Sequence, residues 1–195
     1  MAYELQFESW IPVPLPRVFA FFANPLNLPR LMPPATNTRV DGVRLMPAPP
    51  GPDDDAVAAR RAAGRGSVIE TSFQPLGFVG WRRKWTAVIS GFEWNSYFAD
   101  AQQKGPFKSW HHRHEFRAED REGLKGTVVR DVIEYEVGFG VLGHLANWLF
   151  VERQLRAVFA HRQKVLEDLF RSAESAALAE VLAEDLERST EVRGL

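Results

Sequence analysis

The sequence lacks cysteine at all of its 195 positions, which excludes disulfide bonds, thiolate metal sites and cysteine nucleophiles. It has no apolar run approaching the roughly 20 residues that span a bilayer, and residues 1–10 have neither the basic head nor the apolar stretch of a signal peptide. Positive charge is not in excess either, because 24 basic and 25 acidic residues leave a formal net charge of -1. We therefore expect a cytoplasmic protein with no membrane span and no nucleic-acid partner.

Two common catalytic signatures are also missing from the sequence. It has no G-x-S-x-G stretch and no isolated serine beside a clear base, which argues against a serine hydrolase. It has no glycine-rich phosphate loop, which argues against nucleotide-dependent chemistry. Aromatic side chains, in contrast, are abundant, with 14 Phe, 6 Trp and 3 Tyr. In a chain long enough for one well-filled core, such rings either pack a solid core or line a cavity.

Alternation and helical periodicity together predict an α+β fold. Residues 3–11 alternate between apolar and polar side chains, which is typical of a half-buried strand. Prolines follow, and then an apolar helical spacing over residues 15–22, which Asn24 and Pro25 end. Residues 26–32 predict one more short helical turn. Six further strands are predicted at residues 38–45, 67–74, 81–92, 96–103, 107–116 and 127–137, and their hairpin spacing favours an antiparallel sheet.

The C-terminal part of the chain changes to a helical period. Residues 143–170 carry an apolar stripe, which predicts a helix of roughly 40 Å, enough to cross a sheet. The stripe consists of Leu145, Trp148, Leu149, Leu155, Val158, Phe159, Val165, Leu166 and Leu169. Residues 47–66 are rich in Pro, Gly, Ala and charge, have no core pattern, and predict a flexible surface insertion. Residues 171–195 are a helical or partly disordered tail, which either prolongs the helix, packs on a partner protein or stays partly disordered.

The order of these elements, and four segments within them, resemble the helix-grip fold of the START-related superfamily called SRPBCC. The segments are IPVPLPRVFAFFANPLNLPRL, DAQQKGPFKSWHHRHEF, GTVVRDVIEYEVGFG and VFAHRQKVLEDLF, and they look most like a bacterial polyketide cyclase/dehydrase-type member. The resemblance implies a seven-stranded antiparallel sheet curled around the long C-terminal helix, with two short helices after the first strand and a cavity between sheet and helix. It assigns residues 1–170 to one ligand-binding domain. Many relatives bind or carry lipids, quinones or aromatic polyketides, and some catalyse ring closure, so function must come from the site.

The densest polar cluster lies in the strand predicted at residues 107–116. Because side chains alternate along a strand, Trp110, His112, His114 and Phe116 share one face, and the two large rings indicate the inner face. Asp131 lies on a mainly apolar face of the next strand, where pairing with His112 or His114 across the hairpin would satisfy both groups. The candidate ligand-binding residues are therefore Trp85, Phe98, Trp110, His112, His114, Phe116, Asp131, Ile133 and Tyr135.

Three interpretations of His112, His114 and Asp131 compete. They are a buried hydrogen-bonded network that fixes the hairpin, a polar end of the pocket that orients a ligand carbonyl or hydroxyl, and a metal site with two histidines and one carboxylate. We do not expect the metal site, because the chain has only five histidines and His111 should face away. Arg162 interrupts the apolar stripe of the long helix, and it either pairs with an acid or caps the cavity, or snorkels at the surface.

The function we expect is binding of a hydrophobic small molecule between sheet and helix, without catalysis, metal or cofactor. The ligand would be a lipid, a quinone or an aromatic polyketide-like compound. One alternative is an enzyme, an aromatase/cyclase or dehydratase in which His112 or His114 moves a proton and Asp131 orients it. Another is a chaperone-like module that engages a partner protein through its cavity or its tail.

Overall fold

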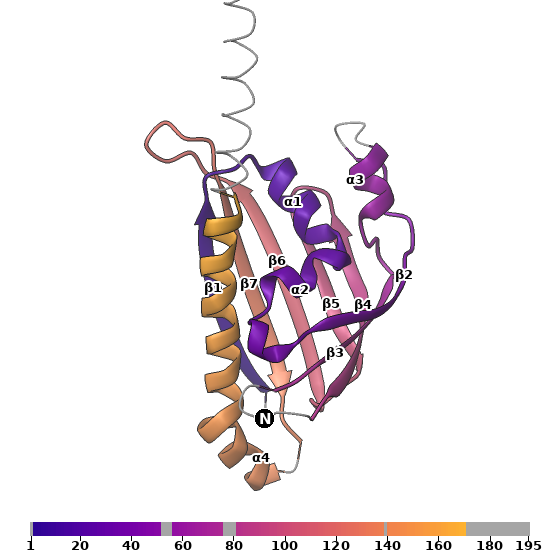
Figure 1. The fold of residues 1–195 in the computed structure, drawn as a ribbon, viewed down its shortest axis with the longest axis vertical. Coiled ribbons are helices and arrows are strands. Elements are labelled where there is room, and N and C mark those ends of the chain that lie inside the picture. Colours follow the sequence, from indigo (N-terminus) through magenta and orange to yellow (C-terminus); the bar gives the residue numbers. More distant parts are fainter. Residues whose placement is uncertain (1, 52–55, 76–80, 139, 171–195) are drawn as a thin grey trace, which may run out of the picture.

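A curled antiparallel sheet of seven strands forms the body of the protein in a computed structural model, which describes residues 2–51, 56–75, 81–138 and 140–170. The strands are β1 (Ala2–Ile11), β2 (Arg39–Arg44), β3 (Val68–Phe73), β4 (Arg83–Glu93), β5 (Tyr97–Lys104), β6 (Ser109–Ala118) and β7 (Thr127–Glu136). Their order across the sheet is β1-β7-β6-β5-β4-β3-β2, so the first strand joins the last at one edge. The predicted α+β helix-grip fold is confirmed, and Figure 1 shows its helices on one face of the sheet.

Two short helices follow β1, as the resemblance implied. Helix α1 (Leu15–Ala23) begins at prolines, which suit the first helical turn because they need no hydrogen bond there, and it buries its apolar side chains against the sheet. Asn24, in an extended conformation, ends it, and the Asn24 side chain caps the next turn by accepting a hydrogen bond from the backbone N–H of Leu26, 3.1 Å away. The chain then passes through the 3-10 turn η1 (Pro25–Asn27), α2 (Leu28–Leu31) and a second 3-10 turn, η2 (Pro34–Thr36). These elements cover one end of the concave face (Figure 1).

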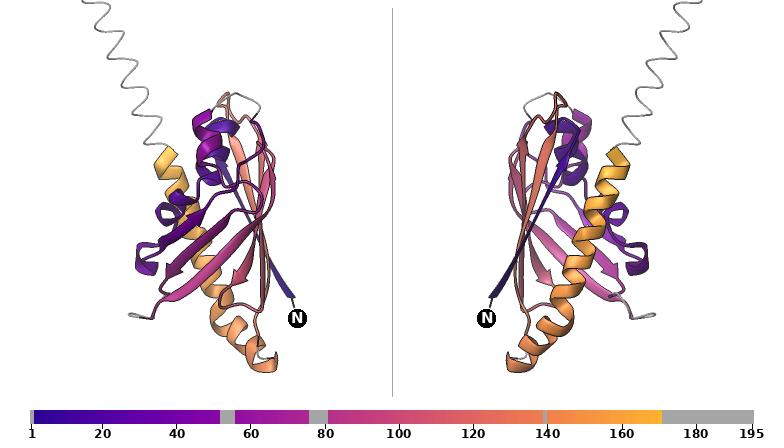
Figure 2. Two further views of the ribbon diagram at one scale, coloured as in Figure 1. Left: turned by 90° about the vertical axis from the view of Figure 1, so that its right-hand side faces the viewer. Right: turned by 90° about the vertical axis from the view of Figure 1, so that its left-hand side faces the viewer.

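The long C-terminal helix lies over β1 and β7, at one side of the same face (Figures 1 and 2). It consists of α4 (Gly140–Ala146), a π-helical turn at η3 (Asn147–Val151) and α-helix through residues 152–170. Two polar contacts fix it: the buried Tyr135 hydroxyl donates to Asn147 Oδ1 at 2.9 Å, and the Gln163 amide donates to the Glu8 carbonyl at 3.0 Å. The Phe7 and Phe159 rings stack between them with centroids 4.6 Å apart. None of the helices among the described residues is long and apolar enough to cross a membrane.

The predicted apolar stripe is wrong at the start of this helix. Leu145, Trp148 and Leu149 are 51 %, 75 % and 58 % exposed, whereas Phe159 and Leu166 are buried as expected. The reason is geometric: α4 projects past the ends of the strands, so its first turns have no sheet beneath them (Figure 1). Helical spacing shows which side chains share a face, but not where the supporting sheet ends.

The predicted insertion at residues 47–66 is less separate from the core than its composition suggested. It contains the short helix α3 (Ala56–Arg61), and the alanines that follow are buried, Ala62 at 2 % and Ala63 at 4 % exposure. The backbone N–H of Ala63 donates to the Ala23 carbonyl at 2.9 Å, which ties the segment to α1. The expectation that the whole segment has little to bury is therefore wrong at its C-terminal end. Its flexibility stays a prediction, and residues 52–55 lie outside the described residues, as does the tail at 171–195.

Limited trypsin digestion should cut the native protein first after Arg60 or Arg61. Both side chains are exposed on the six-residue α3, and a helix this short opens locally at small cost. Arg17 is an internal control, because it is also exposed but lies in α1, a longer helix that buries Val18 and Phe19 directly after it. Mass spectrometry of early fragments, with circular dichroism of the nicked product, should show one cut and an intact core. Resistance until global unfolding would instead indicate an ordered lid.

Candidate functional site

A cavity of about 390 Å³ lies between the concave face of the sheet and the helices that cover it. Its wall is mainly apolar and includes side chains from β3, β4 and β5, from α1 and α2, and from the long helix. Among the residues predicted from sequence, Trp85, Phe98, Trp110, His112 and His114 line this cavity. The space falls within the range of about 300–1,000 Å³ that is typical of small-molecule sites.

Four other predicted residues do not line the cavity. Phe116, Asp131, Ile133 and Tyr135 are buried on the predicted inner face but lie behind the wall, at 6 %, 6 %, 0 % and 1 % exposure. Phe116 packs in the hydrophobic cluster around α1, and Ile133 and Tyr135 pack in a second cluster with Trp110 and Phe159. Position on the inner face was therefore predicted correctly, but contact with the cavity was not, because α1 and the long helix cover parts of that face.

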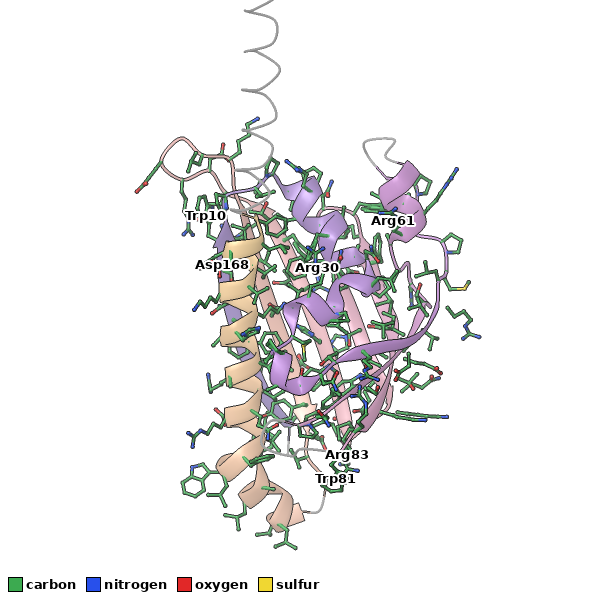
Figure 3. The ribbon with its side chains drawn as sticks, viewed as in Figure 1. Trp10, Arg30, Arg61, Trp81, Arg83 and Asp168 are labelled. Carbon is green, nitrogen blue, oxygen red and sulfur yellow. The ribbon has the colours of Figure 1, made fainter. Side chains whose placement is uncertain are left out.

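Trp81 does not lie in the strand that the sequence predicted at residues 81–92. Strand β4 begins at Arg83, two residues after the predicted start, and Trp81 is 55 % exposed. The Arg83 guanidinium carbon lies 4.0 Å from the centre of the Trp81 ring. Figure 3 shows both side chains at the end of the sheet nearest α4, where they stand outside the packed interior.

Strands β6 and β7 pair as a hairpin, and their side chains have the predicted inward and outward directions. His114 is directly opposite Asp131, and His112 is opposite Ile133. Trp110, His112, His114 and Phe116 are all buried, while His111 points outward and is exposed. The alternation of side chains alone thus identified which histidines face the interior.

Asp131 accepts from both inner histidines through a single oxygen atom. Its Oδ1 lies 2.9 Å from His112 Nε2 and 2.6 Å from His114 Nδ1. An ionised carboxylate only accepts hydrogen bonds, so each of these ring nitrogens carries a proton and donates it to Asp131. Across the site, Arg162 Nη1 lies 3.7 Å from the same oxygen. The expected pairing of Asp131 with a histidine is confirmed, and both histidines take part.

Arg162 stabilises this arrangement mainly through its charge. Its side chain is 9 % exposed and lines the cavity, so the alternatives of acid pairing and cavity capping both apply, and surface snorkelling does not. Arg162 Nη2 lies 3.4 Å from His114 Nδ1, but it cannot donate to a nitrogen whose own proton points at Asp131. Arg162 Nε is buried without a hydrogen-bond partner among the described residues. This N–H group therefore makes no hydrogen bond to these residues.

Burial and neighbouring charges set the protonation states of the cluster. Burial, reinforced by the His112 charge, lowers the pKa of His114 to about 3 despite its contact with Asp131, so this ring is neutral near pH 7. Burial alone would raise the pKa of Asp131, but the Arg162 charge and the two histidines hold it well below its usual range. The cluster therefore pairs an ionised carboxylate with a guanidinium around a neutral imidazole.

Asp100 belongs to the same cluster, and the sequence analysis missed it. It lies on β5 directly opposite His112, with its Oδ2 3.7 Å from His112 Nδ1 and 3.9 Å from His114 Nε2. Its side chain lines the cavity, and burial raises the pKa of this carboxyl group. The signal was present in the sequence: Phe98 was expected to face inward, and Asp100 is two residues further along the same strand.

We call Asp100, His112, His114, Asp131 and Arg162 the buried polar cluster. It does not form one end of the cavity, because apolar wall continues on both sides of it. His114 lies against the Phe98 ring, with centroids 4.3 Å apart, and His112 lies against Phe159 at 5.5 Å. Since Phe98 and Phe159 belong to different hydrophobic clusters, the polar group occupies the junction between them.

The comparisons with known proteins agree with this architecture. The sequence model of the family described as "Polyketide cyclase / dehydrase and lipid transport" matches residues 11–164. The match covers well over half of the 195 residues, and the chain therefore belongs to this family, within the START-related SRPBCC superfamily. No curated protein sequence matches the chain.

Solved structures share the fold at low sequence identity. TTHA0849 from Thermus thermophilus is 19 % identical with a TM-score of 0.56, and the match covers 88 % of this chain and 99 % of that one. A START superfamily protein from Mycobacterium smegmatis is 13 % identical with a TM-score of 0.59, over 87 % and 98 % of the two chains. Ara h 8.0201 is 13 % identical with a TM-score of 0.55, over 88 % and 99 %. At these identities the likeness shows the fold alone.

Proposed function

We propose that this protein binds a hydrophobic small molecule, such as a lipid, a quinone or an aromatic polyketide-like compound, in the cavity between the sheet and the long helix. The observation that carries the proposal is a mainly apolar cavity of about 390 Å³ with a few convergent polar groups in its wall. The family description, which names lipid transport beside cyclase and dehydrase activity, supports hydrophobic ligands in general.

The buried polar cluster gives this ligand a preferred orientation. Arg162 lines the cavity, so its guanidinium N–H groups can donate to a ligand carbonyl or hydroxyl oxygen there. The opposite charges of Asp131 and Arg162 offset each other, which favours a neutral polar group on the ligand over a charged one. Apolar wall on both sides of the cluster favours a molecule whose oxygen atom lies between two apolar parts.

Filling the cavity should weaken binding at least tenfold without unfolding the protein. Ala87 lines the cavity from β4, and Ala87→Phe would place a ring in the space that a ligand needs. A naphthalene-type fluorescent probe should bind the natural protein. Titration of the variant should give a Kd at least tenfold higher, which is a loss of about 1.4 kcal/mol or more in binding free energy. Phenylalanine suits a strand, so thermal melts should change little.

Val88→Phe is the matched control, because Val88 is the next residue of β4 and does not line the cavity. It adds a similar ring to the other face of the sheet and should leave probe affinity unchanged. Treatment with a chelator should also leave it unchanged, since an apolar probe depends on buried area and not on polar contacts. If both phenylalanine variants weaken the probe equally, it binds elsewhere and the proposal fails.

A further inference from the structure

Three metal-binding side chains converge on one point of the cavity wall. Asp100, His112 and His114 each offer one ligand atom, and these atoms all lie within 4.8 Å of one another. They come from the neighbouring strands β5 and β6, whose pairing places Asp100 directly opposite His112. In a tetrahedral zinc site the donors are about 3.4 Å apart. The two Asp100 distances of 3.7 and 3.9 Å are each within about half an ångström of this value, and no two of the three donor atoms are more than 4.8 Å apart.

The two imidazole rings are already oriented for such a site. His112 uses Nε2 and His114 uses Nδ1 to donate to Asp131, so the lone pairs remain on His112 Nδ1 and His114 Nε2. These are the nitrogens that face Asp100 Oδ2. A carboxylate that accepts the second ring proton of a histidine ligand is the usual outer partner at metal sites, where it fixes the tautomer and the ring orientation. Here one carboxylate does this for both rings.

We propose that Asp100, His112 and His114 bind one divalent first-row transition metal ion, such as zinc or iron(II), on the cavity wall. Two imidazoles and one carboxylate are a donor set that such ions accept with coordination positions left open. All three side chains line the cavity, so the open positions would face a ligand there. The metal site considered from the sequence had the same two histidines but Asp131 as its carboxylate. Asp131 is instead the positioning residue, and Asp100 is the third ligand.

The charges around the site are compatible with a cation. Asp100 and Asp131 would contribute two negative charges next to the ion, and Arg162, 3.7 Å from Asp131, contributes one positive charge. With the ion in place the site would carry a net charge of about +1, which favours an anionic or strongly polarised oxygen at the open positions. This inference goes beyond the proposed binding of a hydrophobic molecule and does not depend on it.

Metal titration of the full chain tests the site directly. Protein purified without an affinity tag is stripped with a chelator, exchanged into buffer and titrated with Zn²⁺ by calorimetry and with Co²⁺ by visible absorption. We expect one ion per chain and a Co²⁺ spectrum typical of mixed nitrogen and oxygen ligands. Asp100→Asn should weaken binding at least tenfold, and this isosteric change should fold normally because Asp100 makes no contact shorter than 3.7 Å to either histidine.

His111→Ala is the matched control, because it removes a neighbouring imidazole that points away from the site. It should leave the stoichiometry, the affinity and the Co²⁺ spectrum unchanged. The proposal is overturned if the stripped protein binds no ion, if Asp100→Asn binds as tightly as the natural protein, or if His111→Ala removes binding. Because the apolar probe is measured with chelator present, failure of the metal site and failure of the apolar cavity are observed separately.

Discussion

Replacing Asp131 with alanine should lower the free energy of unfolding by about 3–5 kcal/mol, the range for a buried ion pair that loses one partner. Asp131 Oδ1 is the shared acceptor of His112 Nε2 and His114 Nδ1, and it faces the Arg162 guanidinium. Without it, two imidazole N–H groups and a buried positive charge lose their partner in the same place. The Arg162 side chain is 9 % exposed, so water cannot easily replace the lost contact.

Thermal melts and urea titrations measure this loss. For a chain of this length each kcal/mol corresponds to about 2–4 °C in Tm, so the shift should be large. Glu134→Ala on the same strand and His111→Ala on the opposite face of β6 are the controls, because both side chains are exposed. Each should change stability by less than about 0.5 kcal/mol. If His111→Ala is as damaging as Asp131→Ala, the strand register described here is not the register in solution.

The part of this cluster that strand periodicity governs could be predicted from the sequence. A period of two places His112 and His114 inward and His111 outward, and the short connection from β6 to β7 makes Asp131 a hairpin neighbour. The same rule, applied to the strand that carries Phe98, also places Asp100 inward, but the mixed polar and small residues around Asp100 give no apolar alternation that marks the inner face. These relations are local, since each depends on one strand or one hairpin.

The part that depends on how the helix lies over the sheet could not be predicted. Arg162 lies 3.7 Å from Asp131 because the long helix lies over β7 with these two residues level, a position that helical spacing does not determine. For the same reason Phe116 and Tyr135 were expected at the cavity but lie behind its wall, and Leu145 and Trp148 were expected in the core but are exposed. The sequence of one strand determines which of its side chains face inward. Whether those side chains line the cavity also depends on where the helices cover the sheet.

Among cavity residues, Trp110 should have the largest effect on binding of an apolar ligand. It lines the cavity and belongs to the ring cluster with Trp85 and Phe107, at centroid distances of 5.0 Å to each. If the Trp110 ring covers about 60 Å² of the ligand, its loss costs about 1.5 kcal/mol at 25 cal/mol per Å². Trp110→Ala should therefore raise the Kd of a naphthalene-type probe about tenfold. His112→Ala should raise it only about threefold, because one polar contact contributes less than a large apolar surface.

The same two variants separate a binding protein from an enzyme. If His112 moved a proton in a cyclase or dehydratase reaction, His112→Ala would keep binding but reduce turnover about 10²–10⁴-fold. The compound to use is the one extracted from the purified protein after native mass spectrometry, with conversion followed by chromatography.

Trp110→Phe is the conservative control: it keeps a ring in the core, where truncation to alanine costs about 3–5 kcal/mol of stability, and it should recover most of the affinity. All titrations are carried out at a temperature well below the lowest Tm among the variants, so that every variant is folded. Retained binding with lost conversion in His112→Ala would replace the binding hypothesis with the enzymatic one, whereas a Trp110→Ala variant that folds and binds normally would place the ligand away from this cavity.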